Sequence, residues 1–229
     1  MKIGIIGAGN IGGALARRLT ALGHDVSIAN SRGPETLAGL ASETGAKPVS
    51  VEQAARSGDL VIVTIPEKRI LRLPSGLFEG VPDTVVVVDT GNYYPQQRDG
   101  RIDAIENGAT ESRWVADRLG RPVVKAFNTI YARHLLERGK PKGAAGRIAL
   151  PVAGDDRRAK DVAFRLLDEM GFDAVDGGSL DESWRQQPGT PIYGADLDAV
   201  GARKALSEAK QVRPAAFRAG PGSPDASGG

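Results

Sequence analysis

Three glycines near the start of the chain have the spacing of a phosphate-binding turn. They occur in the segment GAGNIG, residues 7–12, which directly follows a short apolar run and precedes a helix-forming stretch. In such a turn the first glycine permits a tight bend, the second lets the backbone approach a pyrophosphate, and the third lets the helix pack closely on the strand. The N-terminus of the helix adds unpaired N–H groups and a partial positive charge. The pattern therefore predicts a dinucleotide site.

The residues that end the second apolar run indicate which dinucleotide binds. Residues 26–29 are followed by Asn30, Ser31 and Arg32. NAD sites usually have an Asp or Glu here, whose carboxylate accepts hydrogen bonds from the ribose hydroxyls. A carboxylate would repel a 2′-phosphate, whereas an arginine can bind one bidentately and a serine can donate to it. We therefore predict NADP(H), against the alternative that Arg32 is one more solvated surface side chain.

Residues at the ends of three later strands could complete the site. Ligands of open parallel sheets bind beyond the carboxyl ends of the strands. Ile65 and Pro66 follow the third predicted strand and could form an apolar wall. Asn92 and Asn128 follow the fourth and fifth strands and could hydrogen-bond a carboxamide or a substrate carbonyl. Asparagine is also common where a strand turns into a loop, so each asparagine alone has an ordinary interpretation.

Other titratable and aromatic residues near these strand ends have stronger ordinary interpretations. Lys125 could act as a general acid, but it lies inside an apolar strand, where a lysine often packs its stem and directs its amine outward. His134 is expected on the surface or at a helix cap. Tyr93 and Tyr94 could stack on a ring or simply cover the loop.

Strands and helices alternate along most of the chain, which would bring the strand ends to one edge of a sheet. We expect strands at 2–6, 26–29, 59–65, 84–89 and 122–127, with 147–153 and 172–175 as the last strands. This order predicts an α/β fold of the Rossmann type, a doubly wound parallel sheet with a small, mostly helical C-terminal extension. We expect an NADP-binding domain at 1–178, a helical extension at 179–212 and a disordered tail at 213–229.

The composition excludes several classes of function. The chain has 229 residues, 41% hydrophobic and 25% charged, which is typical of a globular protein. It has no Cys and two His, which excludes disulfides and thiolate catalysis and indicates no metal site. The net charge of +2 is too small to indicate nucleic acid, and no apolar run has the length of a membrane span. The first strand starts directly after Met1, so we expect no signal peptide and a cytoplasmic location.

Several segments resemble one family of reductases. The segments are GAGNIGGALARRL, NSR after the second strand, VTIP, VVVDTGN and especially VVKAFNTI, and the resemblance covers residues 1–178. They resemble the NADPH-dependent oxidoreductases that reduce coenzyme F-420, a deazaflavin. They are also similar to the reductase domain of the STEAP metalloreductases. The resemblance implies a hydride transfer between the nicotinamide of NADP(H) and a deazaflavin or a flavin, the latter as FMN or FAD.

The resemblance also implies roles for individual residues. Ala8 and Asn10 would lie along the pyrophosphate, Ser31 and Arg32 would bind the 2′-phosphate, and Asn128 with Ile130 would position the two rings. Archaeal members have His in place of Asn128 and Thr in place of Ala8. Together with the glycine turn and the strand ends, the predicted cofactor residues are Gly7, Ala8, Gly9, Asn10, Ile11, Gly12, Asn30, Ser31, Arg32, Ile65, Pro66 and Asn92.

Two other functions are compatible with the same glycine turn. One is a dehydrogenase or reductase of a small carbonyl or imine compound, although only about fifty residues follow position 178, too few for the large helical domain of the β-hydroxyacid dehydrogenases. The other is a protein that senses NADP(H) without catalysis. We expect a small-molecule hydride acceptor or donor as partner. We also expect a homodimer, because the resembling reductases are dimeric and because the helix that starts near residue 197 needs cover for its apolar side.

Overall fold

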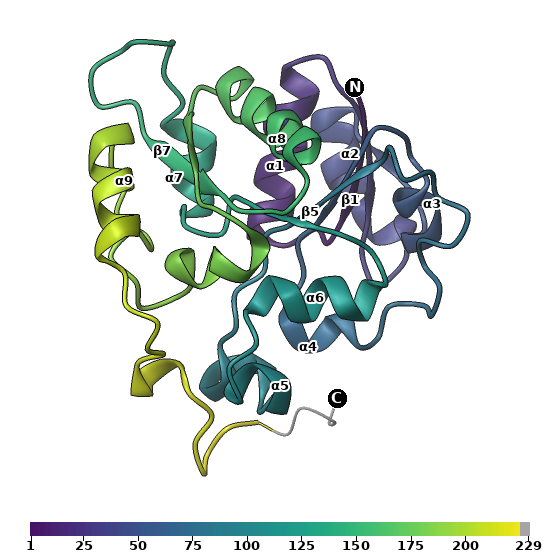
Figure 1. Cartoon of the computed structure of the whole chain (residues 1–229). Coiled ribbons are helices and arrows are strands. Elements are labelled where there is room, and N and C mark those ends of the chain that lie inside the picture. Colours follow the sequence, from purple (N-terminus) through teal and green to yellow (C-terminus); the bar gives the residue numbers. More distant parts are fainter. Residues whose placement is uncertain (225–229) are drawn as a thin grey trace.

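Six parallel strands form the centre of the fold (Figure 1). The computed structural model describes residues 1–224. The strands are β1 (Lys2–Ile6), β2 (Asp25–Ala29), β3 (Lys47–Pro48), β4 (Leu60–Val63), β5 (Val86–Asp89) and β6 (Val124–Lys125). Their order in the sheet is β3-β2-β1-β4-β5-β6, with all neighbours parallel. From β1 the chain adds β2 and β3 on one side of the sheet and then β4, β5 and β6 on the other. A crevice for a ligand is therefore expected outside the carboxyl ends of β1 and β4, where this order reverses.

Helices connect the strands and continue to the end of the described chain. The α-helices are α1 (Asn10–Ala21), α2 (Ala38–Thr44), α3 (Val51–Ala55), α4 (Glu67–Ile70), α5 (Asp103–Glu106), α6 (Glu111–Leu119), α7 (Ala132–Glu137), α8 (Arg157–Glu169) and α9 (Ala199–Glu208). Short helical turns are η1 (Pro34–Leu37), η2 (Pro95–Asp99), η3 (Leu180–Gln186) and η4 (Ala215–Phe217). Within residues 1–224, no helix is long and apolar enough to cross a lipid bilayer.

The sheet is covered by helices on both faces. Alternate strand residues such as Ile5 and Ile62 pack on one face with α1, α7 and α8. Their neighbours, including Ile6 and Val63, pack on the other face with α3, α4, α5 and α6. This explains why the strands are apolar and β-branched without alternation, since both faces of a parallel sheet are buried. The predicted doubly wound α/β fold is confirmed.

The last two predicted strands form a separate sheet. β7 (Ala149–Val152) and β8 (Asp173–Asp176) pair in parallel with each other. The contact with the main sheet is an antiparallel bridge, in which the backbone N–H of Lys125 donates to the oxygen of Ala153 at 2.8 Å and that of Ala153 donates back at 3.0 Å. β7 therefore approaches β6 from the opposite direction and does not extend the parallel order.

The C-terminal extension packs on this small sheet. The apolar side of α9, with Ala202 and Leu206, lies in one core cluster with Ala149 of β7 and Val175 of β8. The chain itself thus covers the face that we expected a second subunit to cover. The expected homodimer therefore rests on the resemblance alone, and the division into domains at residue 178 stays a prediction.

Residues of the expected disordered tail contact two earlier segments of the chain. The side-chain Nε2 of Gln96 donates to the backbone oxygens of Ala215 and Arg218 at 3.1 and 2.9 Å. The backbone N–H of Ala219 donates to Oε1 of Glu106 in α5 at 2.7 Å. These polar contacts join the segment to η2 and α5, and the expected disorder of the tail stays a prediction. The rest of the expected tail, 225–229, lies outside the described residues.

Candidate functional site

The turn between β1 and α1 has no room for side chains at two of its glycines. Gly7 has a φ of 115°, and a Cβ there would lie 2.2 Å from the backbone oxygen of Thr64. A Cβ at Gly12 would lie 1.9 Å from the backbone oxygen of Gly7, so α1 rests directly on the turn. A Cβ at Gly9, by contrast, would meet no atom of the described residues within 4 Å. The space over Gly9 is therefore available to a ligand.

The N-terminus of α1 opens onto the same space. Gly9 is its N-cap residue, no side chain caps the helix, and the N–H of Gly13 is bonded to the oxygen of Gly9 at 2.8 Å. The amides of Asn10, Ile11 and Gly12 have no acceptor within the helix. Unpaired amides and the positive end of a twelve-residue helix dipole attract phosphate oxygens. The turn thus fits a pyrophosphate.

The end of β2 presents a free guanidinium. Asn30 closes the turn, because its Nδ2 donates to Oγ1 of Thr36 at 2.8 Å and its Oδ1 accepts from the backbone N–H of Arg32 at 2.9 Å. Ser31 and Arg32 are exposed. No side-chain bond of Arg32 occurs among residues 1–224, so its guanidinium is free for a phosphate. Asn30 therefore stabilises this turn, and both polar atoms of its side chain already have hydrogen-bond partners.

A carboxylate that the sequence analysis left out also lies at this turn. Glu35 is in the first turn of η1, and its Oε1 would lie 2.3 Å from a Cβ placed on Gly33. Its side chain is thus folded back toward the segment that follows Arg32. An acidic group there opposes a 2′-phosphate by like-charge repulsion. Glu35 is exposed, so it can turn away toward solvent at small cost.

Two asparagines from different strand ends contact each other directly. Asn92 follows β5 and is half-buried, and its Nδ2 donates to the backbone oxygen of Asn128 at 3.0 Å. In return, Nδ2 of Asn128 donates to Oδ1 of Asn92 at 3.0 Å. The strand order places β5 and β6 side by side, so their loops meet at one edge of the sheet. The two residues that we predicted to bind a carboxamide or carbonyl are therefore neighbours.

The side chain of Asn128 is fully occupied as a donor. Besides the bond to Asn92, its Nδ2 donates to the backbone oxygen of Gln186 at 2.7 Å, and its Oδ1 accepts from Nε2 of Gln186 at 2.8 Å. An amide nitrogen has two protons, so no donor of Asn128 is left for a ligand, whereas Asn92 retains one N–H. Gln186 belongs to η3, far along the chain, and no sequence pattern indicated it.

The apolar members of the predicted site lie on two sides of this network. Ile65 and Pro66 are half-buried beyond the end of β4 and can contact a ligand. Ile130 is 5% exposed and belongs to the core cluster against which Ala8 and Ile11 pack. Ile130 is therefore a core residue, and the accessible apolar surface is provided by Ile65 and Pro66.

The backbone before Asn128 has an unusual conformation. Phe127 has a φ of 63°, in the left-handed region that side chains rarely adopt, and its ring is 1% exposed. Such residues cost about 1–3 kcal/mol and are concentrated at functional sites. The bend ends β6 abruptly and lets Asn128 leave the sheet toward Asn92.

A cluster of charged side chains lies buried behind the loop that follows β5. Lys125 is fully buried, and its Nζ donates to Oδ2 of Asp89 at 3.1 Å and to the backbone oxygen of Gly91 at 2.5 Å. Asp89, 1% exposed, also accepts from Oγ of Ser112 at 2.6 Å. Our expectation that Lys125 directs its amine outward is wrong, because helices cover both faces of the sheet and the partner for the amine lies on the neighbouring strand.

Two further carboxyl groups complete this cluster. Glu111, the first residue of α6, is fully buried and accepts from Nη1 of Arg213 at 2.9 Å. Glu67 in α4 is also fully buried, and neither of its oxygens has a hydrogen-bond partner among the described residues. Burial raises the pKa of Glu67 well above its ordinary value, Asp89 raises it further, and Lys125 partly opposes this. Glu67 thus keeps its proton to a higher pH than an exposed glutamate does.

This raised pKa predicts a pH dependence of stability. Above about pH 4.5 the unfolded chain releases the proton of Glu67, while the folded protein retains it up to the raised pKa. The free energy of unfolding therefore falls as the pH rises through this window. The neutral amide of Glu67→Gln removes the effect, so we expect a flatter pH profile in urea unfolding than in the wild type.

Glu79→Gln is the matched control for this experiment, because Glu79 is an exposed glutamate. Its pH profile is expected to follow the wild type. Parallel profiles for the wild type and Glu67→Gln between pH 4.5 and 8 would contradict the assignment.

The remaining candidates from the sequence lie away from the strand ends or have structural partners. Tyr93 is fully buried, and its hydroxyl donates to the backbone oxygen of Gly100, which lies between η2 and α5. Tyr94 contacts the hydroxyl of Tyr193. Nδ1 of His134, on α7, lies 2.5 Å from Oδ2 of Asp196. These contacts favour the ordinary interpretation of all three residues.

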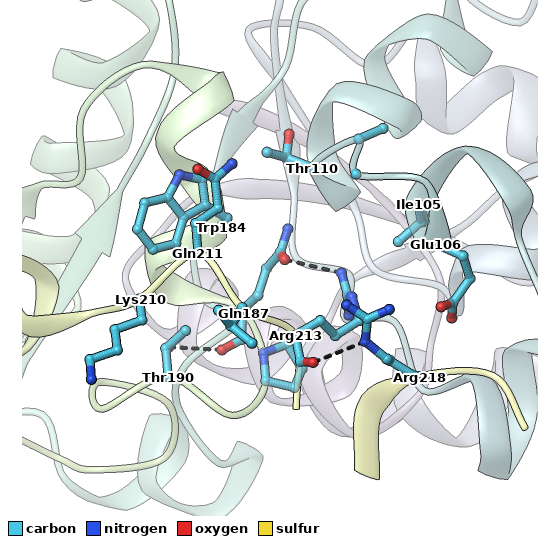
Figure 2. Close-up of a pocket in the computed structure, with 14 residues that line it drawn as sticks. Ile105, Glu106, Thr110, Trp184, Gln187, Thr190, Lys210, Gln211, Arg213 and Arg218 are labelled. Atoms are coloured by element: carbon cyan, nitrogen blue, oxygen red, sulfur yellow. Dashed lines mark hydrogen bonds between the residues drawn. The ribbon is translucent and has the colours of Figure 1, made fainter. Parts of the chain in front are cut away.

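A cavity of about 190 Å³ lies between the connection from α5 to α6, η3 and the C-terminal segment (Figure 2). Arg213 is in its wall, and its Nη2 donates to Oε1 of Gln187 at 3.1 Å. The lining consists of residues 105–110, 184–190 and 210–218, so it includes none of the predicted cofactor residues. The candidate site at the strand ends is distinct from this cavity.

Comparisons with known proteins show what the chain is similar to. The family model described as "NADP oxidoreductase coenzyme F420-dependent" matches residues 2–93, which include the glycine turn, Arg32 and Asn92. The hypothetical protein SMa0349 of Sinorhizobium meliloti is 32% identical, with a TM-score of 0.72 over 86% of this chain and 95% of that protein. The chain belongs to this oxidoreductase family.

Two further relatives are similar to the chain. A candidate F420-dependent NADP reductase of Arthrobacter sp. FB24 is 25% identical, with a TM-score of 0.66 over 78% of this chain and 85% of the reductase. The metalloreductase STEAP3 of Rattus norvegicus is 29% identical over 180 residues, which make up 78% of this chain. The aligned part spans 34% of STEAP3 and 52% of another curated relative, so the chain matches about half or less of their length.

Proposed function

We propose that this NADP(H)-dependent oxidoreductase transfers a hydride between the nicotinamide and a deazaflavin or flavin ring. The observation that supports the proposal is the meeting of three features at one edge of the sheet. These are the open turn at Gly9, the free guanidinium of Arg32 and the amide pair of Asn92 and Asn128. The turn at Gly9 fits the pyrophosphate, the guanidinium of Arg32 fits the 2′-phosphate, and the amide pair fits the carboxamide of the nicotinamide.

The residues of the chain would bind and orient the cofactor. The amides at the start of α1 bind the pyrophosphate, and Ser31 with Arg32 binds the 2′-phosphate. Asn92 donates its remaining N–H to the carboxamide, while Ile65 and Pro66 exclude water from one side. When bound, the nicotinamide supplies or accepts the hydride at C4. Holding two rings in contact is a matter of position and of water exclusion, which such a site can provide.

The amide side chains favour a ring acceptor over a small carbonyl or imine compound. Reduction of a carbonyl needs a proton donor at the oxygen, and neutral amides such as Asn92 and Asn128 have no proton to transfer at neutral pH. A reduced flavin-type ring can take its proton from water. A test must therefore distinguish the proposed function from a carbonyl or imine reductase and from a protein that senses NADP(H) without catalysis.

Stopped-flow oxidation of NADPH separates the three functions. NADPH is mixed with the protein and with coenzyme F-420, FMN, FAD or a panel of aldehydes and imines, and its absorbance is followed. Rapid oxidation with a flavin-type ring alone is the expected result. Oxidation only by carbonyl or imine compounds would assign the protein to the second function, and binding without oxidation by any acceptor would assign it to the third.

The assembly and location of the protein are part of the proposal. The resemblance to dimeric reductases supports a homodimer, which the covered apolar face of α9 neither requires nor prevents. The cytoplasmic location that the sequence analysis expects is likewise proposed.

A further inference from the structure

The buried ion pair of Asp89 and Lys125 holds both peptide groups of Gly91. The N–H of Gly91 donates to Oδ1 of Asp89 at 2.8 Å, and its carbonyl oxygen accepts from Nζ of Lys125 at 2.5 Å. The two residues are 1% and 0% exposed, and Oδ2 of Asp89 accepts from Lys125 and from Ser112. The next residue is Asn92. The loop is therefore fixed one residue before the side chain that we expect to contact the nicotinamide.

The carboxyl groups of Glu67 and Asp89 both lie on the side of Gly91 to which a Cβ would point. A Cβ at Gly91 would lie 2.6 Å from Oε1 of Glu67 and 3.0 Å from Oδ1 of Asp89. Gly91 thus has no room to move toward the cluster. Since Asn128 is also hydrogen-bonded to the side chain of Asn92, the loop is restrained at both residues.

Stability alone does not account for this arrangement. Burying two charges costs several kcal/mol, and replacing a buried ion pair by well-packed apolar residues of similar volume is often neutral or stabilising. What an apolar pair cannot supply is a donor that fixes the carbonyl of Gly91 in one direction. The ion pair therefore fixes the position of the loop at Gly91.

We propose that Asp89 and Lys125 are positioning residues, which fix Gly91 so that Asn92 presents its free N–H to the nicotinamide carboxamide. The inference rests on the proposed function, because it needs a nicotinamide at this place. Neither residue touches the ring. Their effect is on the orientation of the nicotinamide, whereas the adenosine half of the cofactor is held by the glycine turn and Arg32.

The double variant Asp89→Asn with Lys125→Met tests this inference, because it removes both charges and leaves neither buried alone. We expect its affinity for 2′,5′-ADP, which lacks the nicotinamide, to stay within about twofold of wild type, since the adenosine half binds elsewhere. The single-turnover rate of hydride transfer from NADPH to the flavin-type acceptor of the stopped-flow experiment is expected to fall about 10²-fold. A misplacement of the reacting ring by about 1 Å can cause a loss of this size. If the double variant were unfolded, both its affinity for 2′,5′-ADP and its hydride transfer would fall.

Arg147→Met with Asp173→Asn is the matched control. The side chain of Arg147 is 2% exposed and pairs with Asp173 at 2.6 Å, at the start of the β7–β8 sheet and away from the loop after β5. This control should leave both 2′,5′-ADP affinity and hydride transfer unchanged, whatever its effect on melting temperature.

A second variant covers the case in which the double variant does not fold. Gly91→Ala keeps the ion pair but forces the loop away from Glu67, so hydride transfer should fall while 2′,5′-ADP affinity is kept. Wild-type hydride transfer in Gly91→Ala, or in a folded double variant, overturns the inference and leaves the proposed function intact. A wild-type protein that binds 2′,5′-ADP but transfers no hydride from NADPH overturns the proposed function, and the inference with it.

Discussion

Gly12→Ala is expected to destabilise the protein by about 3 kcal/mol or more and to abolish NADPH binding. The added methyl group would lie 1.9 Å from the backbone oxygen of Gly7 and 2.9 Å from the side chain of Thr64. The contact with Gly7 is with backbone, so either the turn or α1 must shift, and overpacking of this kind costs about 1–3 kcal/mol or more. Chemical unfolding and titration with NADPH measure the two effects.

The adjacent glycine of the same helix provides the control. A Cβ at Gly13 would meet only the end of the Arg17 side chain, at 3.1 Å, which can move. Alanine is favoured over glycine inside a helix by about 1 kcal/mol, so Gly13→Ala should be neutral or stabilising. Equal destabilisation by Gly12→Ala and Gly13→Ala would show that the close approach of α1 to the turn is not real.

Gly9→Ala separates the binding role of the turn from its structural role. Its Cβ would meet no described atom within 4 Å, and its backbone φ of −77° suits alanine. Stability is therefore expected to stay within about 0.5 kcal/mol of wild type. The methyl group would occupy the space over the amides of α1, so the affinity for NADPH should fall strongly in a protein that is folded normally.

Arg32→Ala is expected to lower the affinity for NADPH about 10²-fold and to leave the affinity for NADH unchanged. Hydrogen bonds to charged groups contribute about 1.5–3 kcal/mol, and a tenfold change in affinity corresponds to about 1.4 kcal/mol. The 2′-phosphate is the only difference between the two nucleotides, so the ratio of their dissociation constants isolates the contribution of Arg32. An equal loss for both nucleotides would remove Arg32 from the phosphate site.

Glu35→Gln is the companion variant for the same measurement. Its carboxylate is folded toward Gly33, next to the predicted 2′-phosphate position. Removing the negative charge should increase the affinity for NADPH severalfold and affect NADH little. Together the two variants test whether opposite charges at the end of β2 set the preference for the phosphorylated cofactor.

The fold could be predicted because its signals are local. The apolar β-branched runs, the glycine turn and the helices between them lie within a few residues of one another, and a parallel order follows from their alternation. The meeting of Asn92 and Asn128 could be expected in the same way, since adjacent parallel strands end at one edge. The structure confirmed the sheet and placed these two asparagines in direct contact.

Other parts of the site depend on contacts that no local pattern contains. Gln186 reaches Asn128 from η3, and Arg213 neutralises the buried Glu111 from a segment whose composition resembles a tail. The burial of Lys125 was missed because a lysine in an apolar strand has the same sequence context whether its amine reaches solvent or a neighbouring aspartate. The β7–β8 pair was separated from the main sheet by its direction of approach, which its residues alone do not specify.

The bend at Phe127 places two opposing demands on one position. A φ of 63° favours glycine, while a ring that is 1% exposed in the core favours a large apolar residue. Glycine would relieve the backbone and lose an aromatic side chain whose burial contributes about 1.5–3 kcal/mol. A β-branched residue would pack but raise the backbone cost further. Few single substitutions of Phe127 are therefore acceptable, and its replacements should arise together with compensating changes in the surrounding core.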